Sequence, residues 1–168
     1  ADAKETAACS LAALGLQAPA VMALTRQDLP QLPDTSKEAC RGGYVLRDPQ
    51  GTPDLILMGS GSEVELLYQA ADILAAQGYK ARLVSMPCME LFAKQDAAYQ
   101  ESVLPKAVRK RVSVEAGSTV SWQKYVGLDG QAIGIDRFGA SAPAARVFAE
   151  YGFTAEHVAE VASRVIQG

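Results

Sequence analysis

Residues 44–168 alternate between two patterns of hydrophobic and polar positions. Short apolar runs typical of strands are separated by longer segments in which apolar residues recur every three or four positions, as in helices. The expected strands are residues 44–48, 54–59, 80–86, 112–117 and 131–136. Because helical segments separate most of these runs, the pattern predicts a three-layer α/β fold with a mostly parallel five-stranded sheet.

One strand of this sheet is expected to be antiparallel. Residues 48–51, Asp-Pro-Gln-Gly, are a tight-turn sequence and predict a hairpin between the first two strands. The second strand runs into the glycine-rich turn at residues 59–62, and a helix is expected over 63–77, ending at Gly78. A closing helix is expected over 154–166, with Thr154 as its N-cap.

The first 43 residues are organised differently. Residues 3–14 are rich in alanine and favour a helix, and the apolar run at 20–25 is typical of a strand buried on both faces. Residues 30–43 contain two prolines and end in Gly-Gly, which indicates a linker. We therefore expect residues 1–29 to be the last helix and strand of a preceding domain and 44–168 to be a complete domain. Without that domain, residues 1–25 should be poorly anchored.

Composition narrows the possible functions. The 168 residues suffice for one domain and a short piece of another. The net charge of −3 leaves no basic excess to neutralise phosphates, so no nucleic-acid partner is expected. No apolar run reaches the roughly 18 residues that cross a bilayer, so no membrane partner is expected either. The three cysteines, Cys9, Cys40 and Cys88, form no paired motif and suit reduced thiols in a cytoplasmic protein.

Two features could carry a ligand. The turn at residues 59–62 opens a helix, where free backbone N–H groups can bind an anion. Val64 stands where a dinucleotide fingerprint has glycine, and no P-loop lysine follows, so the turn is either a small-anion site or a structural turn. Glu115 at a strand end is either a ligand-binding group or a hydrogen-bonding one.

The other chemistry-bearing residues form no catalytic set. His157, the single histidine, lies in the closing helix and is expected at the surface. Trp122 and Tyr125 are expected as core or interface anchors. No nucleophile with a base, and no metal-ligand cluster, occurs in the sequence. The residues alone therefore identify no catalytic, cofactor-binding or metal-binding residue.

Nine short strings, taken in order and spacing, resemble the C-terminal region of transketolases. They are residues 23–30 (ALTRQDLP), 41–46 (RGGYVL), 59–66 (GSGSEVEL), 84–87 (VSMP), 94–99 (KQDAAY), 101–105 (ESVLP), 114–117 (VEAG), 124–127 (KYVG) and 138–143 (FGASAP). The resemblance implies that residues 1–29 end a pyrimidine-binding domain and that 44–168 form the transketolase C-terminal domain.

The resemblance also implies a function. Transketolases use thiamine diphosphate and Mg2+ (or Ca2+) to transfer a two-carbon ketol unit from a ketose phosphate to an aldose phosphate, in the pentose phosphate pathway and as homodimers. Arg26 matches the family arginine that contacts the sugar phosphate, although Thr25 and Asp28 stand where serine and asparagine are commoner. Almost none of the cofactor site matches this chain, so the chain is expected to be an inactive part of a longer enzyme, with no cofactor of its own.

Two other interpretations stay open at this point. The chain could be a stand-alone regulatory module that binds a small anion at residues 59–62. It could also be the C-terminal domain of a related thiamine-diphosphate enzyme, such as deoxyxylulose-phosphate synthase or a 2-oxoacid dehydrogenase subunit. The strings around Arg26 and at residues 138–143 favour a transketolase over these.

Overall fold

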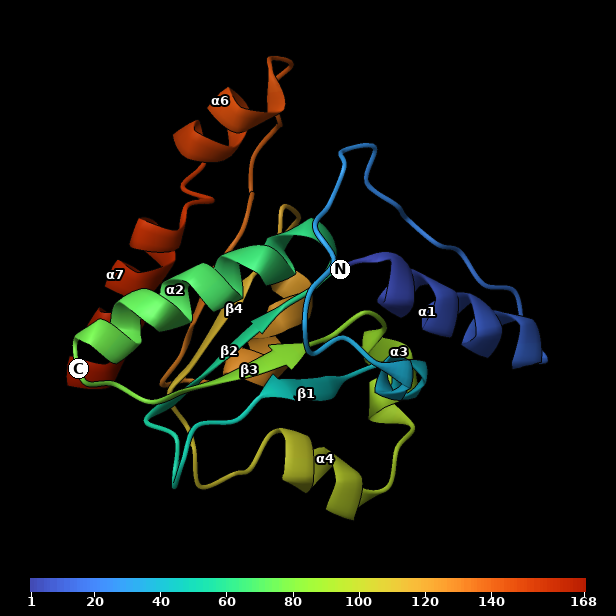
Figure 1. Cartoon of the computed structure of the whole chain (residues 1–168), viewed down its shortest axis with the longest axis horizontal. Helices are drawn as coiled ribbons and strands as arrows, with labels where there is room; N and C mark the ends of the chain where they lie inside the picture. Colours follow the sequence, from blue (N-terminus) through green and yellow to red (C-terminus); the bar gives the residue numbers. More distant parts are fainter.

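A computed structural model describes residues 1–168, which form a three-layer α/β fold around one sheet (Figure 1). The strands are β1 (Tyr44–Arg47), β2 (Leu55–Gly59), β3 (Ala81–Ser85), β4 (Arg111–Val114) and β5 (Gln131–Ile133). Their order is β1-β3-β2-β4-β5, with β1 antiparallel to β3 and every other pair parallel. The predicted fold class, a mostly parallel five-stranded sheet with one antiparallel strand, is confirmed.

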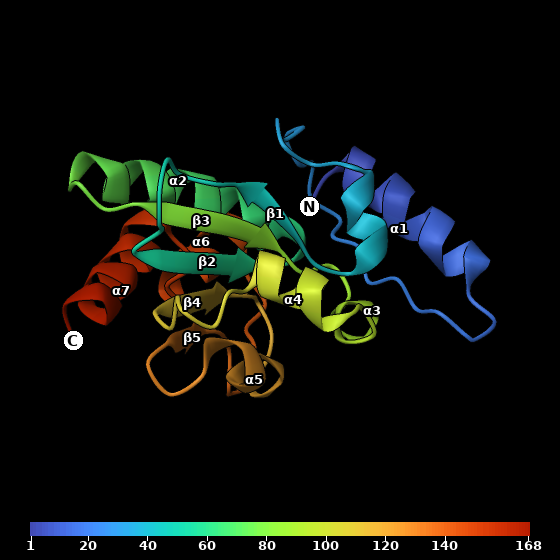
Figure 2. The same cartoon turned by 90° about the horizontal axis from the view of Figure 1, so that it is seen from below.

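Helices cover both faces of the sheet. On one face lie α2 (Val64–Ala76) and α7 (Ala155–Gln167), and on the other lie α3 (Met89–Ala93), α4 (Ala97–Val103) and α5 (Gln123–Val126) (Figures 1 and 2). Successive side chains of β2 alternate between these two layers, and all of its apolar residues are fully buried. Burial on both faces explains why this strand is a continuous apolar run in the sequence.

The predicted hairpin between the first two strands is wrong. β1 pairs with β3, and β2 lies one position further into the sheet, between β3 and β4. β2 is apolar on both faces and gains most from a central position, whereas β1 alternates buried and half-buried residues and suits an edge. β1 and β2 are two strand spacings apart, about 10 Å, and the seven residues between them, 48–54, are long enough to cross that distance.

The N-terminal part contains α1 (Ala3–Gly15) and the short 3-10 helix η1 (Lys37–Arg41), joined by a long loop over residues 16–36. Residues 20–25, expected to be a strand paired within a preceding domain and unpaired in this chain, pair with no strand of the sheet. Val21 is 95% exposed and Leu24 is 63% exposed. An apolar run becomes a strand only where a neighbouring strand satisfies its backbone groups, and none lies here.

The remaining elements are short. They are the 3-10 helices η2 (Gly61–Glu63) and η3 (Thr119–Trp122) and the helix α6 (Ala144–Glu150), which projects beyond the sheet in Figure 1. Thr154 caps α7 as predicted, since its hydroxyl accepts from the His157 N–H at 3.2 Å. No helix has the length and apolar character required to span a bilayer.

Candidate functional site

The loop at residues 16–36 carries Arg26, the one residue that the sequence assigned to substrate binding. Arg26 is exposed, and its guanidinium forms neither a hydrogen bond nor an ion pair within the chain. The Thr25 hydroxyl accepts from the Gln27 N–H at 3.3 Å, a local contact that bends the chain beside Arg26. A free guanidinium presents several donors in a rigid fork, which is suited to the oxygens of a phosphate.

The C-terminal end of this loop meets the start of α1 at Asp2, which is only 4% exposed. One carboxylate oxygen of Asp2 caps α1 by accepting from the Glu5 N–H at 2.9 Å. The other oxygen accepts from the Leu32 N–H at 3.0 Å, from the Thr35 hydroxyl at 2.6 Å and from the Gln31 amide. We call these contacts of Asp2 with residues 31–35 the Asp2 clasp.

Hydrogen bonds keep the buried Asp2 carboxylate charged. Burial by itself would raise the pKa of Asp2, but the hydrogen bonds from the Glu5 N–H, the Thr35 hydroxyl and the Leu32 N–H outweigh it. The pKa of Asp2 therefore lies below its usual value of 3.8, and the clasp carries a full negative charge at neutral pH. Charged acceptors make stronger hydrogen bonds than neutral ones, so the clasp is a strong attachment of the loop.

Glu5 attaches the first turn of α1 to the sheet. Its side chain is buried, pairs with the ammonium group of Ala1, and accepts from the Tyr44 hydroxyl at 3.0 Å and from the Ser85 hydroxyl. Burial, followed by the negative charge of Glu5, raises the pKa of Tyr44. The first turn of α1 is thus joined to β1 and β3, and the expectation of poor anchoring is wrong for this turn.

The glycine-rich turn and Glu115 lie together at the carboxyl ends of β2 and β4. The Ser60 hydroxyl donates to one oxygen of Glu115 at 2.9 Å, and the Trp122 indole N–H donates to the other. Ser60 makes no capping hydrogen bond to the helix that follows. Both oxygens of Glu115 are therefore occupied by partners in the chain, which is the hydrogen-bonding role that the sequence left open.

Glu63 follows the same turn and was missed by the sequence reasoning. It is 5% exposed and accepts from the Ala116 N–H at 3.1 Å and from the Ser62 hydroxyl at 2.6 Å. Burial is the main cause that raises the pKa of Glu63, and the nearby charge of Glu115 adds to it. Two carboxylates beside residues 59–62 disfavour an anion there, so the geometry does not support a small-anion site.

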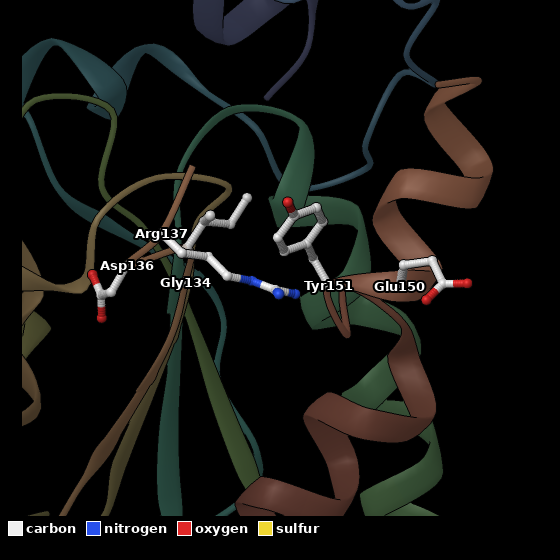
Figure 3. Close-up of a pocket in the computed structure, with 6 residues that line it drawn as sticks. Gly134, Asp136, Arg137, Glu150 and Tyr151 are labelled. Atoms are coloured by element: carbon white, nitrogen blue, oxygen red, sulfur yellow. The ribbon is translucent and has the colours of Figure 1, made fainter. Parts of the chain in front are cut away.

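A shallow pocket of about 330 Å³ lies where β5 ends (Figure 3). The Arg137 guanidinium stacks over the Tyr151 ring at 4.6 Å, and Asp136 accepts from the Ser118 and Thr119 hydroxyls at 3.0 and 2.7 Å. The polar side chains that line this pocket are exposed or already paired, so none of them is a buried polar group without a partner. The lining residues are Gly134, Ile135, Asp136, Arg137, Glu150 and Tyr151.

The other residues that the sequence singled out have structural positions. Trp122 and Tyr125 are buried and stack edge to face, with ring centroids 6.4 Å apart, so the prediction of core anchors is confirmed. His157 lies on α7 with its side chain 41% exposed, 3.9 Å from the Glu160 carboxylate. It contacts no nucleophile. Cys9, Cys40 and Cys88 are all unpaired.

The mixed sheet, its two helical layers and the preceding arginine-bearing loop define a three-layer α/β domain with an attached loop segment. Residues 42–154 match the family described as the transketolase-like TK C-terminal domain. This chain belongs to the transketolase family. The resemblance found in the nine strings is confirmed, and the comparisons support neither the stand-alone module nor the related thiamine-diphosphate enzymes.

Relatives from distant organisms share this similarity. The chain is 52% identical over 162 residues to the chloroplastic transketolase of Zea mays, a match of 94% of this chain and 24% of the relative. It is 52% identical over 163 residues to the probable transketolase of Streptococcus pneumoniae, with 96% and 25% covered. The chain thus spans about a quarter of the length of the curated relatives.

Solved structures agree over almost the whole chain. The transketolase of Pichia stipitis in complex with sedoheptulose 7-phosphate has a TM-score of 0.92 and 43% identity, covering 99% of this chain and 24% of that one. The transketolase of Leishmania mexicana has a TM-score of 0.92 and 36% identity, with the same coverage. Because the match covers 99% of the chain, it includes α1 and the Arg26 loop as well as the sheet.

Proposed function

We propose that this chain is the C-terminal part of a transketolase that transfers a two-carbon ketol unit from a ketose phosphate to an aldose phosphate. The proposal rests on the family membership and on a fold match that includes the Arg26 loop. The complete enzyme acts as a cytoplasmic homodimer in the pentose phosphate pathway, with phosphorylated sugars as substrates. The role of this chain in it is to support the dimer and to supply one substrate contact.

The cofactor chemistry belongs to parts of the enzyme outside these 168 residues. No group of three or more His, Cys, Asp or Glu residues in this chain could hold a metal ion, so its residues do not fit the Mg2+ (or Ca2+) that accompanies thiamine diphosphate. The sequence also has no Gly-Asp-Gly loop followed by asparagine. We therefore derive no step of the ketol transfer from this chain and assign it neither catalytic nor cofactor-binding residues.

Arg26 is the residue we propose to contact the substrate phosphate. The single observation that carries this role is a guanidinium free of any partner within the chain, on a loop whose C-terminal end is held by the Asp2 clasp. Exposed Arg41 and Arg109 are paired with carboxylates, and Arg137 stacks on Tyr151. Two further exposed arginines have no hydrogen bond or ion pair, Arg146 and Arg164, but they lie on the helices α6 and α7 and not on a loop. A phosphate dianion would supply to Arg26 an anionic partner, and its oxygens can accept from two guanidinium N–H groups at once, as the Asp48 carboxylate does from Arg82.

Kinetics of the complete enzyme test this role. Arg26→Ala should raise KM for phosphorylated sugars by about 10- to 150-fold, because a hydrogen bond to a charged group is worth about 1.5 to 3 kcal/mol. An unphosphorylated ketose donor should be affected far less, since it offers no anion. Arg109→Ala, which removes an exposed arginine before β4, is the matched control and should leave both values unchanged. Equal losses for both donors would show that Arg26 acts through folding instead.

The chain by itself should show no ketol transfer. Xylulose 5-phosphate and ribose 5-phosphate should stay unchanged when the 168-residue chain is incubated with thiamine diphosphate and magnesium. The reason is the missing metal-binding segment, without which the pyrophosphate of the cofactor has no anchor. Turnover by a preparation proven free of any longer transketolase would contradict the proposal.

A further inference from the structure

The Asp2 clasp has a geometry that an ordinary helix cap does not need. Capping α1 requires one carboxylate oxygen, which accepts from the Glu5 N–H. The second oxygen is used entirely by residues 31–35, some thirty positions further along the chain. Asp2 therefore closes the base of the segment that contains α1 and the Arg26 loop.

A second aspartate shows what capping alone looks like. Asp96 is the N-cap of α4 and accepts from the Tyr99 N–H at 2.8 Å. No distant segment donates to the Asp96 carboxylate, and the contact is exposed. Asp2 and Asp96 share the capping contact and differ in the clasp. The clasp is thus a separate function of the Asp2 carboxylate.

The clasp lies a short distance along the chain from Arg26. Five residues separate Arg26 from Leu32, and Pro30 lies among them with a fixed φ angle. The Leu32 side chain is 6% exposed, so the clasp also holds the chain where it enters the core. Fixing the chain here reduces the conformations open to residues 26–30 before any ligand arrives, and such preorganisation strengthens binding.

We infer that Asp2 is a positioning residue for substrate phosphate: its clasp on residues 31–35 fixes the loop that presents the Arg26 guanidinium. The inference rests on the proposed phosphate contact of Arg26. Asp2 touches no substrate and acts only through the loop. Its loss should weaken the binding of phosphorylated sugars without slowing the transfer of the ketol unit.

Two substitutions in the complete enzyme break the clasp from opposite sides. Asp2→Asn keeps an oxygen that can cap α1 but places an amide NH2 against the donors of residues 31–35. Thr35→Val removes the hydroxyl that donates to Asp2 at 2.6 Å, keeps the side-chain shape and leaves Asp2 intact. Asp96→Asn is the matched control, because it makes the same chemical change at a cap without a clasp.

The readouts are KM and kcat, each with a phosphorylated donor and with an unphosphorylated one, together with the melting temperature. Asp2→Asn should raise KM for the phosphorylated donor about 3- to 10-fold, the factor expected when one side chain must be ordered on binding. The value of kcat and the KM for the unphosphorylated donor should stay within about twofold, the limit for a residue that acts only through phosphate binding. Thr35→Val should act in the same direction and less strongly, and Asp96→Asn should change neither KM.

The double variant Asp2→Asn with Arg26→Ala separates the two proposals. If the clasp acts through Arg26, the double variant should bind the phosphorylated donor no more weakly than Arg26→Ala alone. A selective loss in Arg26→Ala, with unchanged KM in both Asp2→Asn and Thr35→Val, would overturn the inference and leave the proposed function intact. No selective loss in Arg26→Ala would overturn both. Should Asp2→Asn fail to fold, Thr35→Val decides alone.

Discussion

Two polar regions of this molecule differ in where their side chains find partners. At the carboxyl ends of β2 and β4, the carboxylates of Glu63 and Glu115 each accept two hydrogen bonds from neighbours in the chain. On the loop at residues 16–36, Arg26 has no partner in the chain. The first region looks the more promising in sequence, because ligands of open α/β sheets bind at the carboxyl ends of strands. In the second region the Arg26 guanidinium is left free, as the proposed phosphate contact requires.

Apolar side chains show the same difference. The strands and the helices α2 and α7 keep their large hydrophobic residues buried or half-buried, and the sheet domain exposes such residues only on its short connecting segments, at Val120, Leu128 and Phe138. By contrast, α1 and the following loop expose Leu11, Leu14, Val21 and Leu24 by 63% or more. In the solved transketolases this segment lies within chains about four times as long. The sheet domain is thus stabilised by contacts of its own, and the loop region is only partly so.

Hydrogen exchange should separate the two regions most clearly. Amides of residues 55–58 lie in the central strand and should exchange only on global unfolding, whereas those of 21–24 make no backbone hydrogen bond. In a dilute monomer of this chain, protection should differ by at least about a thousandfold. Equal protection of the two segments would show that residues 20–25 belong to this fold and that the predicted linker at 30–43 is no domain boundary.

The same substitution in the two regions should have unequal effects on stability. Leu57→Ala creates a cavity at a fully buried position of β2 and should lower the free energy of unfolding by about 2 to 5 kcal/mol. Leu24→Ala removes a side chain that is 63% exposed and should change it by no more than about 0.5 kcal/mol. Urea unfolding of the 168-residue chain measures both. A cost above 1 kcal/mol for Leu24→Ala would mean that the loop packs on the domain.

Most elements of the sheet domain could be predicted from the sequence, because the signals for strands and helix ends are local. Buried strands are continuous apolar runs, and helix ends carry local markers such as Thr154, so the elements and the fold class followed from the pattern. The partner of each strand is not a local property. The turn at residues 48–51 signals a change of direction, but the choice of β3 as the neighbour of β1 depends on which strand gains most from the centre of the sheet.

The residues that organise the site were harder to predict for the same reason. Arg26 was found through a string that resembles a family, and no rule of spacing marked it. Asp2 stands directly before an alanine-rich helix, a position that signals an N-cap, yet its second role depends on residues 31–35. Glu5 pairs with Tyr44 and Ser85 across the fold. The contacts of Asp2 and Glu5 join residues far apart in the sequence and form only when the chain folds, so no local sequence pattern predicts them.

Glu115→Gln should show that the carboxyl end of the sheet is structural. The substitution removes the negative charge; the glutamine oxygen can accept from the Trp122 indole N–H, and its NH2 group can donate to the Ser60 hydroxyl, which must then accept instead of donate. Two charge-assisted hydrogen bonds thus become neutral ones, which are about 1 kcal/mol weaker each, so the free energy of unfolding should fall by about 1 to 2 kcal/mol. In the complete enzyme, KM for sugar phosphates should be unchanged at temperatures where the variant is folded. A selective rise in KM would move the substrate contact from the Arg26 loop to this edge.

Lowering the pH should have the smallest effects on the free energy of unfolding. The contributions of Asp2, in the clasp, and of Glu63, at the carboxyl end of the sheet, should change in opposite directions. The folded-state pKa of Asp2 lies below 3.8, so its contribution to stability is present above pH 3.8 and is lost as the pH falls through the folded-state value. The folded-state pKa of Glu63 lies above 4.5, so its contribution is full below pH 4.5 and is lost as the pH rises through the folded-state value.

Mild acidification from pH 7 should therefore favour the carboxyl end of the sheet before stronger acid opens the clasp. Urea unfolding at a series of pH values, for the unchanged chain beside Glu63→Gln and Asp2→Asn, resolves the two contributions. Glu63→Gln should remove the part of the pH dependence that lies above pH 4.5, and Asp2→Asn should remove part of the loss below pH 3.8. If Asp2→Asn left the acid limb unchanged, the clasp would not be the charged contact described above, because a neutral side chain at that position would serve equally well.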